Sequence, residues 1–379
     1  MSQPQLDCVF LGLSITSAWG NGHATTYRGL LKELSKRGHR VTFLERDVPW
    51  YASNREFEQL PYCNVGLYGS LEELKDRFTE SIRNADVVVV GSYVPEGIAV
   101  GRWVTSVATN ISAFYDIDTP VTLANLAANR CEYISLDLYP KYQLYLSFTG
   151  GPTLQYIERE LGSPCPRPLY CSVDPSLYFP ESESIRWDLA YLGTYAADRQ
   201  PALNELLLKV AQREPDRHFA VGGPQYPSDI RWPANVERIE HVPASEHRSF
   251  YNSQQFTLNL TRQDMVRAGY SPSVRLFEAA ACRVPILTDQ WPGLENFFTP
   301  GSEILPVRTS ADVTSYLRMP IDQRQEIGEK GRRRTLRFHT AAVRAEEFEA
   351  YVLASFKPLS CSKKRTPSAL NRSVTAALS

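Results

Sequence analysis

One segment of the chain, residues 271–289, holds the side chains best suited to chemistry. Its pattern predicts a loop, a helix that begins near Pro272, a tight turn and a strand. The start of such a helix offers free backbone N–H groups and a positive dipole end, which suit a phosphate. Arg275 and Glu278 share one helix face, so Arg275 could bind a diphosphate while Glu278 accepts hydrogen bonds from a ribose. The alternative is an Arg275–Glu278 ion pair on a solvated face, which the small apolar residues around Glu278 disfavour.

A second group of candidates follows the predicted strand 189–192. Gly193 and Thr194 end this strand, and a small residue there lets backbone N–H groups approach a diphosphate. Arg199 comes shortly afterwards and could neutralise the charge of a leaving group. The alternative is an ordinary strand-to-helix turn with a solvated arginine.

A glycine-rich loop near the start of the chain contains Gly20, Asn21 and Gly22. Glycines there allow the backbone to approach a ligand closely. His23 follows directly and is a candidate catalytic or acceptor-contacting group. It could equally be a structural histidine that is hydrogen-bonded at a helix start.

The same loop half-matches the dinucleotide-binding pattern G-x-G-x-x-G, and Glu45 ends the next predicted strand as a ribose-binding acid would. This gives an alternative function, a nicotinamide-dependent oxidoreductase. Two features count against it. The first glycine lies several residues beyond the strand, and the β-branched Thr25 stands where close packing needs a third glycine.

Two aspartates, Asp116 and Asp118, lie at the end of a predicted strand. Strand alternation predicts that both carboxylates point the same way, so that one could be a general base or contact an acceptor. The D-x-D spacing also suits a divalent cation, but this motif lies in the first of two parallel domains, whereas metal-binding D-x-D enzymes have one mixed domain. Asp118 could instead cap a helix that begins at Thr119 and Pro120. Because no other metal-ligand spacing occurs, we expect neither metal nor cofactor.

Short apolar runs that alternate with amphipathic stretches predict the elements that would position these residues. Buried strands are expected at residues 8–14, 41–44, 88–90, 111–115 and 144–148, and then at 189–192, 219–221, 236–239, 256–260 and 285–288. Strand–helix alternation of this kind predicts an α/β fold of doubly wound parallel sheets. The pattern restarts after a polar linker. We therefore expect a first Rossmann-like domain at 1–180, a second at 181–340, a helix at 341–356 that returns toward the first domain, and a disordered tail at 357–379.

Length and composition set further bounds. A chain of 379 residues usually forms more than one domain. Its 41 basic and 42 acidic residues give a net charge of −1, which removes the whole-chain electrostatic reason for nucleic-acid binding. No apolar run approaches the roughly 20 residues of a membrane helix, and we expect no signal peptide. Seven scattered cysteines are typical of reduced thiols and predict a cytoplasmic protein.

Several separate blocks, at residues 14–28, 43–51, 114–120, 190–201 and 271–289, together resemble GT-B glycosyltransferases, and in particular their CgeB-like, spore-maturation-type branch. The resemblance covers about residues 8 to 356. It implies two Rossmann-type domains that face a central cleft, and a glutamate, here Glu278, that holds the donor ribose. It also implies that the loop beginning at His241 runs along the nucleobase. One departure is Tyr270, which stands where common retaining enzymes carry the first acid of an E-x7-E pair.

The resemblance implies a metal-independent glycosyltransferase of polysaccharide biosynthesis. It would move a hexosyl group from a nucleotide-diphosphate sugar to a hydroxyl of a saccharide or other acceptor. The expected donor-binding residues are Gly193, Thr194, Arg199, His241, Arg275 and Glu278. The expected catalytic residues are His23 and Asp116, with Gly20, Asn21, Gly22 and Asp118 on the acceptor side. The alternative from another class is a catalytically inactive nucleotide-sugar-binding protein of an envelope or spore-like assembly.

Overall fold

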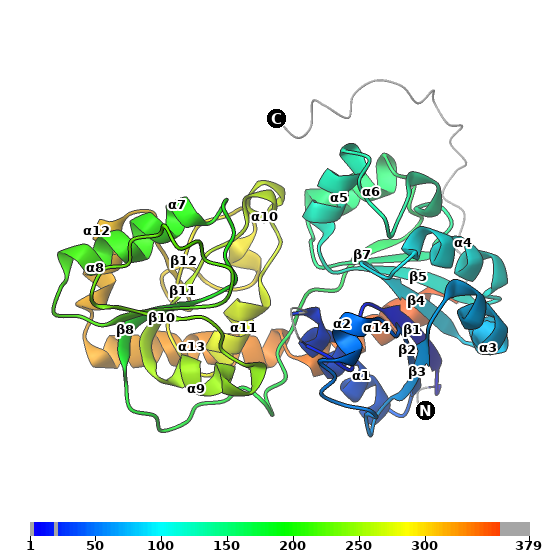
Figure 1. Ribbon diagram of the computed structural model, residues 1–379, viewed down its shortest axis with the longest axis horizontal. Helices are drawn as coiled ribbons and strands as arrows, with labels where there is room; N and C mark the ends of the chain where they lie inside the picture. The colour runs from blue at the N-terminus through cyan, green and yellow to red at the C-terminus, as the bar shows by residue number, and fades with distance from the viewer. Residues whose placement is uncertain (1–3, 19–21, 357–379) are drawn as a thin grey trace.

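The computed structural model describes residues 4–18 and 22–356, which form two parallel sheets, each covered by helices on both faces (Figure 1). The predicted tail at 357–379 lies outside the described residues. The predicted fold class, α/β with two doubly wound parallel sheets, is confirmed.

The first sheet has seven strands in the order β3-β2-β1-β4-β5-β6-β7, and every neighbouring pair is parallel. Its strands are β1 (Asp7–Gly12), β2 (Arg40–Arg46), β3 (Asn64–Tyr68), β4 (Val87–Gly91), β5 (Ile111–Asp116), β6 (Leu144–Ser147) and β7 (Pro166–Pro168). The helices between them are α1 (His23–Lys36), α2 (Pro49–Ala52), α3 (Leu71–Asn84), α4 (Gly97–Val107), α5 (Thr119–Ala127) and α6 (Pro152–Arg159). The central strand β4 is buried along its whole length, as its unbroken run of valines predicts for a strand covered on both faces.

The second sheet has six parallel strands in the order β10-β9-β8-β11-β12-β13. Its strands are β8 (Trp187–Leu192), β9 (Phe219–Gly222), β10 (Val236–Ile239), β11 (Gln254–Asn259), β12 (Ile286–Thr288) and β13 (Leu305–Pro306). The helices are α7 (Gln200–Leu203) and α8 (Lys209–Arg213), joined by a π-helical turn at Asn204–Leu208, then α9 (His247–Asn252), α10 (Gln263–Ala268), α11 (Val274–Ala281), α12 (Ser310–Leu317) and α13 (Ile321–Phe338). The helix expected near Pro272 begins two residues later because Ser273 is its N-cap.

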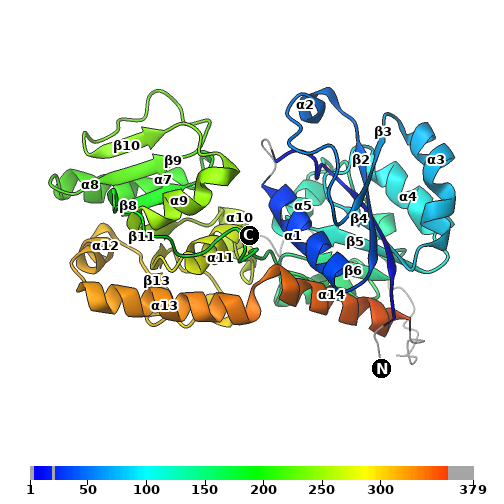
Figure 2. The same ribbon diagram turned by 90° about the horizontal axis from the view of Figure 1, so that it is seen from below.

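The last described helix, α14 (Ala341–Ser355), belongs to the first sheet rather than to the second. Figure 2 shows α13 lying along the second sheet and α14 continuing beneath the first. The Phe348 ring lies 5.6 Å from the Phe10 ring of β1, and the buried Glu349 pairs with Arg37 at 2.6 Å. The chain therefore crosses between the halves twice, and the two crossings meet where Val173 and Thr340 form a short parallel bridge.

In each sheet the order of the strands reverses at one place. In the first sheet β1 lies between β2 and β4, and in the second β8 lies between β9 and β11. Loops that leave such a switch point diverge, which opens a crevice at the carboxyl ends of the strands. The site residues must therefore be sought in the loops after β1, β4 and β5, and after β8 and β11.

Candidate functional site

Three arginines meet at the carboxyl ends of the central strands of the second sheet. Arg199 precedes α7, Arg262 precedes α10 after strand β11, and Arg275 lies in the first turn of α11. Burial lowers the pKa of Arg199, and the positive charges of Arg275 and Arg262 lower it further. Within the described residues none of the three forms an ion pair with a carboxylate. Three guanidinium groups without a counter-ion form a strong site for an anion such as a diphosphate.

Hydrogen bonds to the ends of the strands fix two of these arginines. Arg275 Nη1 donates to Asn259 Oδ1 at 3.1 Å, and its guanidinium lies 5.4 Å from the Tyr191 ring centre. Arg199 Nη2 donates to the carbonyl of Thr194 at 2.6 Å. The arginines are thus held against strands β8 and β11 rather than turned out to solvent. The alternative of a solvated arginine, which the sequence left open for Arg199, is therefore not observed.

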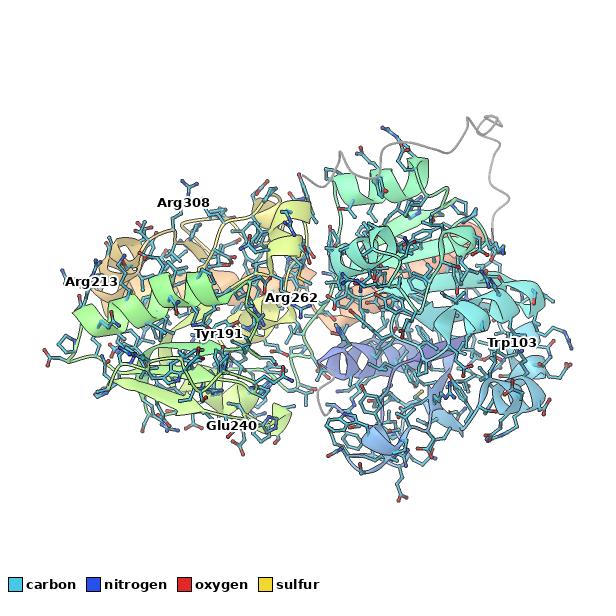
Figure 3. The ribbon with its side chains drawn as sticks, turned by 45° about the horizontal axis from the view of Figure 1, so that its top comes forward. Trp103, Tyr191, Arg213, Glu240, Arg262 and Arg308 are labelled. Atoms are coloured by element: carbon cyan, nitrogen blue, oxygen red, sulfur yellow. The ribbon has the colours of Figure 1, made fainter. Side chains whose placement is uncertain are left out.

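Arg262 directly follows Thr261, which is held by hydrogen bonds to a residue of the neighbouring segment. Asp289, just beyond β12, accepts hydrogen bonds from the backbone N–H of Thr261 at 3.0 Å and from its hydroxyl at 2.9 Å. Figure 3 shows Arg262 at the junction between the two halves of the molecule. Arg262 can therefore act on groups of both sheets.

The turn at Gly193 and Thr194 packs tightly against the loop after β9. The backbone N–H of Gly193 donates to the carbonyl of Gly222 at 2.8 Å, and the Tyr226 hydroxyl donates to the carbonyl of Gly193 at 3.1 Å. Gly223 has a φ of +133°, and a Cβ atom there would lie 2.1 Å from the Gly193 carbonyl oxygen. A glycine is therefore required at 223, where the loop after β9 meets the turn that precedes Arg199.

Glu278 is buried, with 5 % of its surface exposed, and its Oε2 accepts a hydrogen bond from Tyr251 Oη at 3.2 Å. Burial raises the pKa of Tyr178, and the nearby Glu278 carboxylate raises it further. The alternative of a solvated Arg275–Glu278 pair is therefore wrong, because Arg275 bonds to Asn259 instead. A buried carboxylate beside the anion site keeps the ribose assignment open as a prediction.

A histidine and an aspartate face each other at the carboxyl end of the first sheet. His23 is the first residue of α1 and Asp118 is the N-cap residue of α5, with His23 Nε2 lying 3.8 Å from Asp118 Oδ2. Tyr93, which follows β4, donates its hydroxyl to the same oxygen at 2.9 Å. Asp118 makes no side-chain capping bond, so the capping role that the sequence allowed is not observed.

Desolvation lowers the pKa of His23, the Asp118 charge opposes this, and the Arg262 charge lowers the pKa further. His23 is therefore a neutral imidazole at neutral pH and able to accept a proton. The effect of Arg262 also shows that the anion site of the second sheet and the histidine of the first sheet lie within electrostatic reach of each other.

Asp116 differs from Asp118 in its partners, since only Asp118 faces His23. It has no exposed surface, and it accepts hydrogen bonds from Tyr145 Oη at 2.6 Å, Thr122 Oγ1 at 2.8 Å and the backbone N–H of Asp118 at 3.2 Å. Burial raises its pKa to about 6 in spite of these donors. Strand alternation, the basis of the prediction that both carboxylates point the same way, does not extend to Asp118, because β5 ends at Asp116. Asp116 is placed as a structural residue.

The remaining predicted residues are placed as follows. Gly20 and Asn21 lie outside the described residues, and Gly22 is exposed directly before α1. His241 is exposed in the loop after β10, where its contact with a nucleobase stays a prediction.

The carboxylate of Glu45 is fully buried, and both of its oxygens accept hydrogen bonds. Its oxygens accept the hydroxyl and backbone N–H of Thr16, at 2.7 and 3.1 Å, the hydroxyl of Ser14 at 2.8 Å and the backbone N–H of Ile15 at 2.7 Å. Glu45 therefore anchors the loop after β1 and has no oxygen left for a ribose. This removes the main support for the dinucleotide alternative.

Sequence reasoning missed two residues of the site, Arg262 and Tyr93. Both follow strands that the sequence did predict, and both strands flank a switch point. The order of the strands in each sheet, rather than any local motif, brings these side chains to the site.

The two halves also touch directly beside α11. The backbone N–H of Gly150 donates to the carbonyl of Tyr270 at 3.0 Å, and the hydroxyls of Thr149 and Ser271 lie 2.9 Å apart. The loop after β6 thus holds the segment that leads into the arginine-bearing helix.

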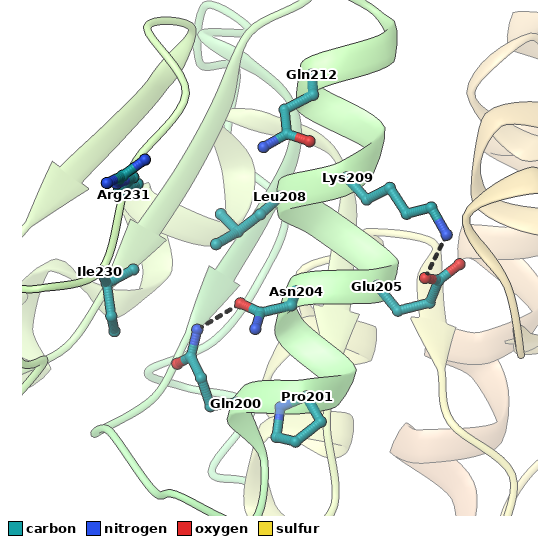
Figure 4. A pocket seen from close by; sticks show the side chains of 9 residues that line it. All are labelled: Gln200, Pro201, Asn204, Glu205, Leu208, Lys209, Gln212, Ile230 and Arg231. Atoms are coloured by element: carbon teal, nitrogen blue, oxygen red, sulfur yellow. Dashed lines mark hydrogen bonds and ion pairs between the residues drawn. The ribbon is translucent and has the colours of Figure 1, made fainter.

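A pocket of about 570 Å³ lies elsewhere, along the outer side of α7 and α8 (Figure 4). Its wall includes Gln200, Glu205, Lys209 and Arg231, of which Glu205 and Lys209 pair with each other at 2.8 Å. None of the arginines of the anion site lines it, so this pocket is separate from the candidate site.

Residues 4–18 and 22–356 contain no group of three or more His, Cys, Asp or Glu side chains arranged to hold a metal ion. None of their helices is long and apolar enough to cross a membrane.

Comparison with solved structures shows what the architecture is. A sucrose-phosphate synthase from Thermosynechococcus elongatus superposes with a TM-score of 0.68 at 14% identity, covering 93% of this chain and 99% of that one. HepE from Anabaena, in complex with UDP-glucose, gives 0.66 at 11% identity, covering 93% of this chain and all of that one. This is the GT-B fold.

A third GT-B structure, an alpha-glucosyltransferase in complex with UDP-glucose and DNA, superposes with a TM-score of 0.68 at 12% identity over 92% of this chain and 100% of that one. Residues 199–350 match the sequence profile of a family described as "Glycosyl transferase-like". No curated protein sequence matches the chain. The profile match begins at Arg199 and includes Arg262, Arg275 and Glu278, so it covers the anion site of this GT-B chain.

Proposed function

We propose that the protein is a glycosyltransferase that moves a sugar from a nucleotide-diphosphate donor to an acceptor hydroxyl. The observation that carries this proposal is the cluster of Arg199, Arg262 and Arg275. It has no carboxylate partner within residues 4–18 and 22–356, and it faces His23 and Asp118 across the two sheets. A diphosphate leaving group carries the charge that such a cluster would stabilise as the sugar departs. The GT-B neighbours in complex with UDP-glucose support the choice of donor.

The donor would lie on the second sheet, with its diphosphate against the arginines and the N-terminus of α11. Glu278 would hold the ribose, and the loop at His241 would follow the base. Because guanidinium groups supply the positive charge, we propose that the transfer needs no bound metal ion.

The acceptor would lie on the first sheet. Here we propose Asp118 in place of Asp116 as the partner of His23, since only Asp118 reaches the imidazole. As the acceptor hydroxyl attacks the sugar, the neutral His23 would take its proton and Asp118 would stabilise the resulting imidazolium. Tyr93 would hold Asp118 in position through its hydroxyl.

We further propose a saccharide acceptor, a role in polysaccharide biosynthesis, a cytoplasmic location and membership of the CgeB-like branch. The balanced charge of the chain argues against a nucleic-acid acceptor. The six cysteines among the described residues are all free thiols, which supports a reducing compartment.

The test is to incubate the full chain with a panel of nucleotide sugars and to measure the release of nucleoside diphosphate. We expect release with at least one donor, and Arg262→Gln should abolish most of it while the protein stays folded. Binding of a donor without any turnover would support the alternative of an inactive nucleotide-sugar-binding protein. A panel in which no donor binds would refute both.

A further inference from the structure

Tyr191, on strand β8, carries a hydroxyl group that the fold does not use. Its side chain is 1 % exposed and packs in the apolar core beside residues such as Leu206 and Phe256. Its Oη has no hydrogen-bond partner among the described residues. A buried hydroxyl without a partner destabilises a fold, so a tyrosine there calls for another explanation than packing.

The hydroxyl lies directly beside the anion site. A Cβ atom at Gly193 would come within 2.5 Å of Tyr191 Oη and within 3.2 Å of Arg275 Nη2, so the hydroxyl and the guanidinium approach the same point of the backbone. The carbonyl of Gly193 already accepts the hydroxyl of Tyr226. Arg199 adds a second unpaired polar atom, because its buried Nε has no partner within the described part of the chain.

The groups that act most strongly on Arg199 all carry hydrogen-bond donors. The groups that shift the pKa of Arg199 are Tyr191, Tyr226 and the two other arginines, in addition to burial, and none of them is a carboxylate. Such a surplus of donors is satisfied by an anion with several acceptor oxygens.

A second tyrosine shows that a buried, unpaired hydroxyl close to a glycine does not by itself indicate a ligand-binding site. Tyr142 is fully buried just before strand β6, its Oη also lacks a partner among the described residues, and a Cβ atom at Gly101 would lie 2.5 Å from it. Only burial raises the pKa of Tyr142, so no charged group lies close to it. Tyr191 differs because Arg275 lies 5.4 Å from its ring centre and Arg199 lies close enough to interact with it electrostatically.

We propose that Tyr191 is a donor-binding residue whose hydroxyl donates a hydrogen bond to a phosphate oxygen of the bound nucleotide, with the Gly193–Thr194 turn moving aside to admit it. This inference rests on the proposed function, since it places the donor diphosphate at the arginine cluster. The Tyr191 hydroxyl would be a neutral hydrogen-bond donor on the inner side of the turn, in addition to the three arginines of the anion site.

The experiment compares Tyr191→Phe with the matched variant Tyr142→Phe. Binding of UDP, GDP, ADP and inorganic pyrophosphate to the full chain is measured by calorimetry, and the stability of each variant is followed by thermal unfolding. Each variant removes one oxygen that the protein leaves unpaired, so neither should lower the melting temperature. We expect Tyr191→Phe to weaken binding of the preferred nucleotide about tenfold, and of pyrophosphate by a similar factor, whereas Tyr142→Phe binds as the wild type does.

The outcomes separate the inference from the proposed function. Wild-type affinity in Tyr191→Phe, or an equal loss in Tyr142→Phe, would overturn the role of Tyr191 and leave the proposed function standing. If the wild-type protein binds none of the four compounds, the proposed function itself fails, and the inference fails with it.

Discussion

One buried histidine makes the stability of this protein depend on pH. The His339 ring stacks on Phe277 with a centroid distance of 4.5 Å, its Nε2 lies 3.2 Å from the carbonyl oxygen of Phe297, and its Nδ1 lies 3.0 Å from Arg344 Nη2. Both contacts suit a neutral ring that donates from Nε2 and accepts at Nδ1. Burial, and next the positive charge of Arg344, lower the pKa of His339 from 6.5 to about 3.

The sign of the effect follows from where the proton binds. Because the folded pKa lies below the unfolded one, the unfolded chain takes up the proton first as the pH falls. The stability is therefore complete above about pH 6.5 and is lost progressively toward pH 3. At pH 5 the protein has moved about 1.5 units into this window, which corresponds to about 2 kcal/mol of unfolding free energy.

Urea unfolding at pH 7 and pH 5 measures this loss in the wild type and in His339→Gln, whose side chain does not titrate. Every other group is shared, so the difference between the two pH-dependent losses isolates His339. We expect the variant to lose about 2 kcal/mol less than the wild type. The exposed His218 provides a control, since His218→Gln should lose as much as the wild type. Equal losses in the wild type and in His339→Gln would refute the reasoning.

Three further predictions concern the site. Asp118→Asn should lower the rate of sugar transfer by roughly 10²- to 10⁴-fold, whereas Asp116→Asn should retain most of it, because only Asp118 faces His23; steady-state rates on both variants decide between them. Glu278→Gln should weaken binding of the nucleotide sugar roughly tenfold or more with the fold intact, and unchanged affinity in calorimetry would reject the ribose assignment. Activity should survive EDTA, since arginines would carry the leaving-group charge; its loss on chelation and return with manganese would favour the D-x-D metal site instead.

The fold could be predicted from the sequence because its central strands are buried on both faces. β4, with four consecutive valines, and β5 read as apolar runs whatever their neighbours are. Of the edge strands, β3, β7 and β13 were not found in this way, whereas β10 was. β3 includes a glycine and is only partly buried, and β7 has three residues of which two are prolines. Such strands are defined by the neighbour they pair with, which the sequence does not state.

The site residues that lie together in one segment of the sequence were predicted, and those that come from separate segments were missed. Arg275 and Glu278 lie in one helix whose start the sequence marks, and both lie beside the anion site. Arg262 depends on the pairing of β11 with β8, and Tyr93 on the pairing of β4 with β1. Asp118 was distinguished from Asp116 only by the end of strand β5, and strand ends are poorly marked in a sequence.

The position of α14 has a consequence for how the protein is made. Strand β7, the last strand of the first sheet, ends at Pro168. Helix α14, which packs against that sheet, does not begin until Ala341. At about 5–20 residues per second, a ribosome would take roughly 10–35 s to cover that interval. During this time the apolar surfaces of Phe10 and α1 await their cover, so the N-terminal half would finish folding last although it is synthesised first. A nascent chain of this kind would be a natural client of chaperones, and any truncation before α14 would leave the same surface open to aggregation.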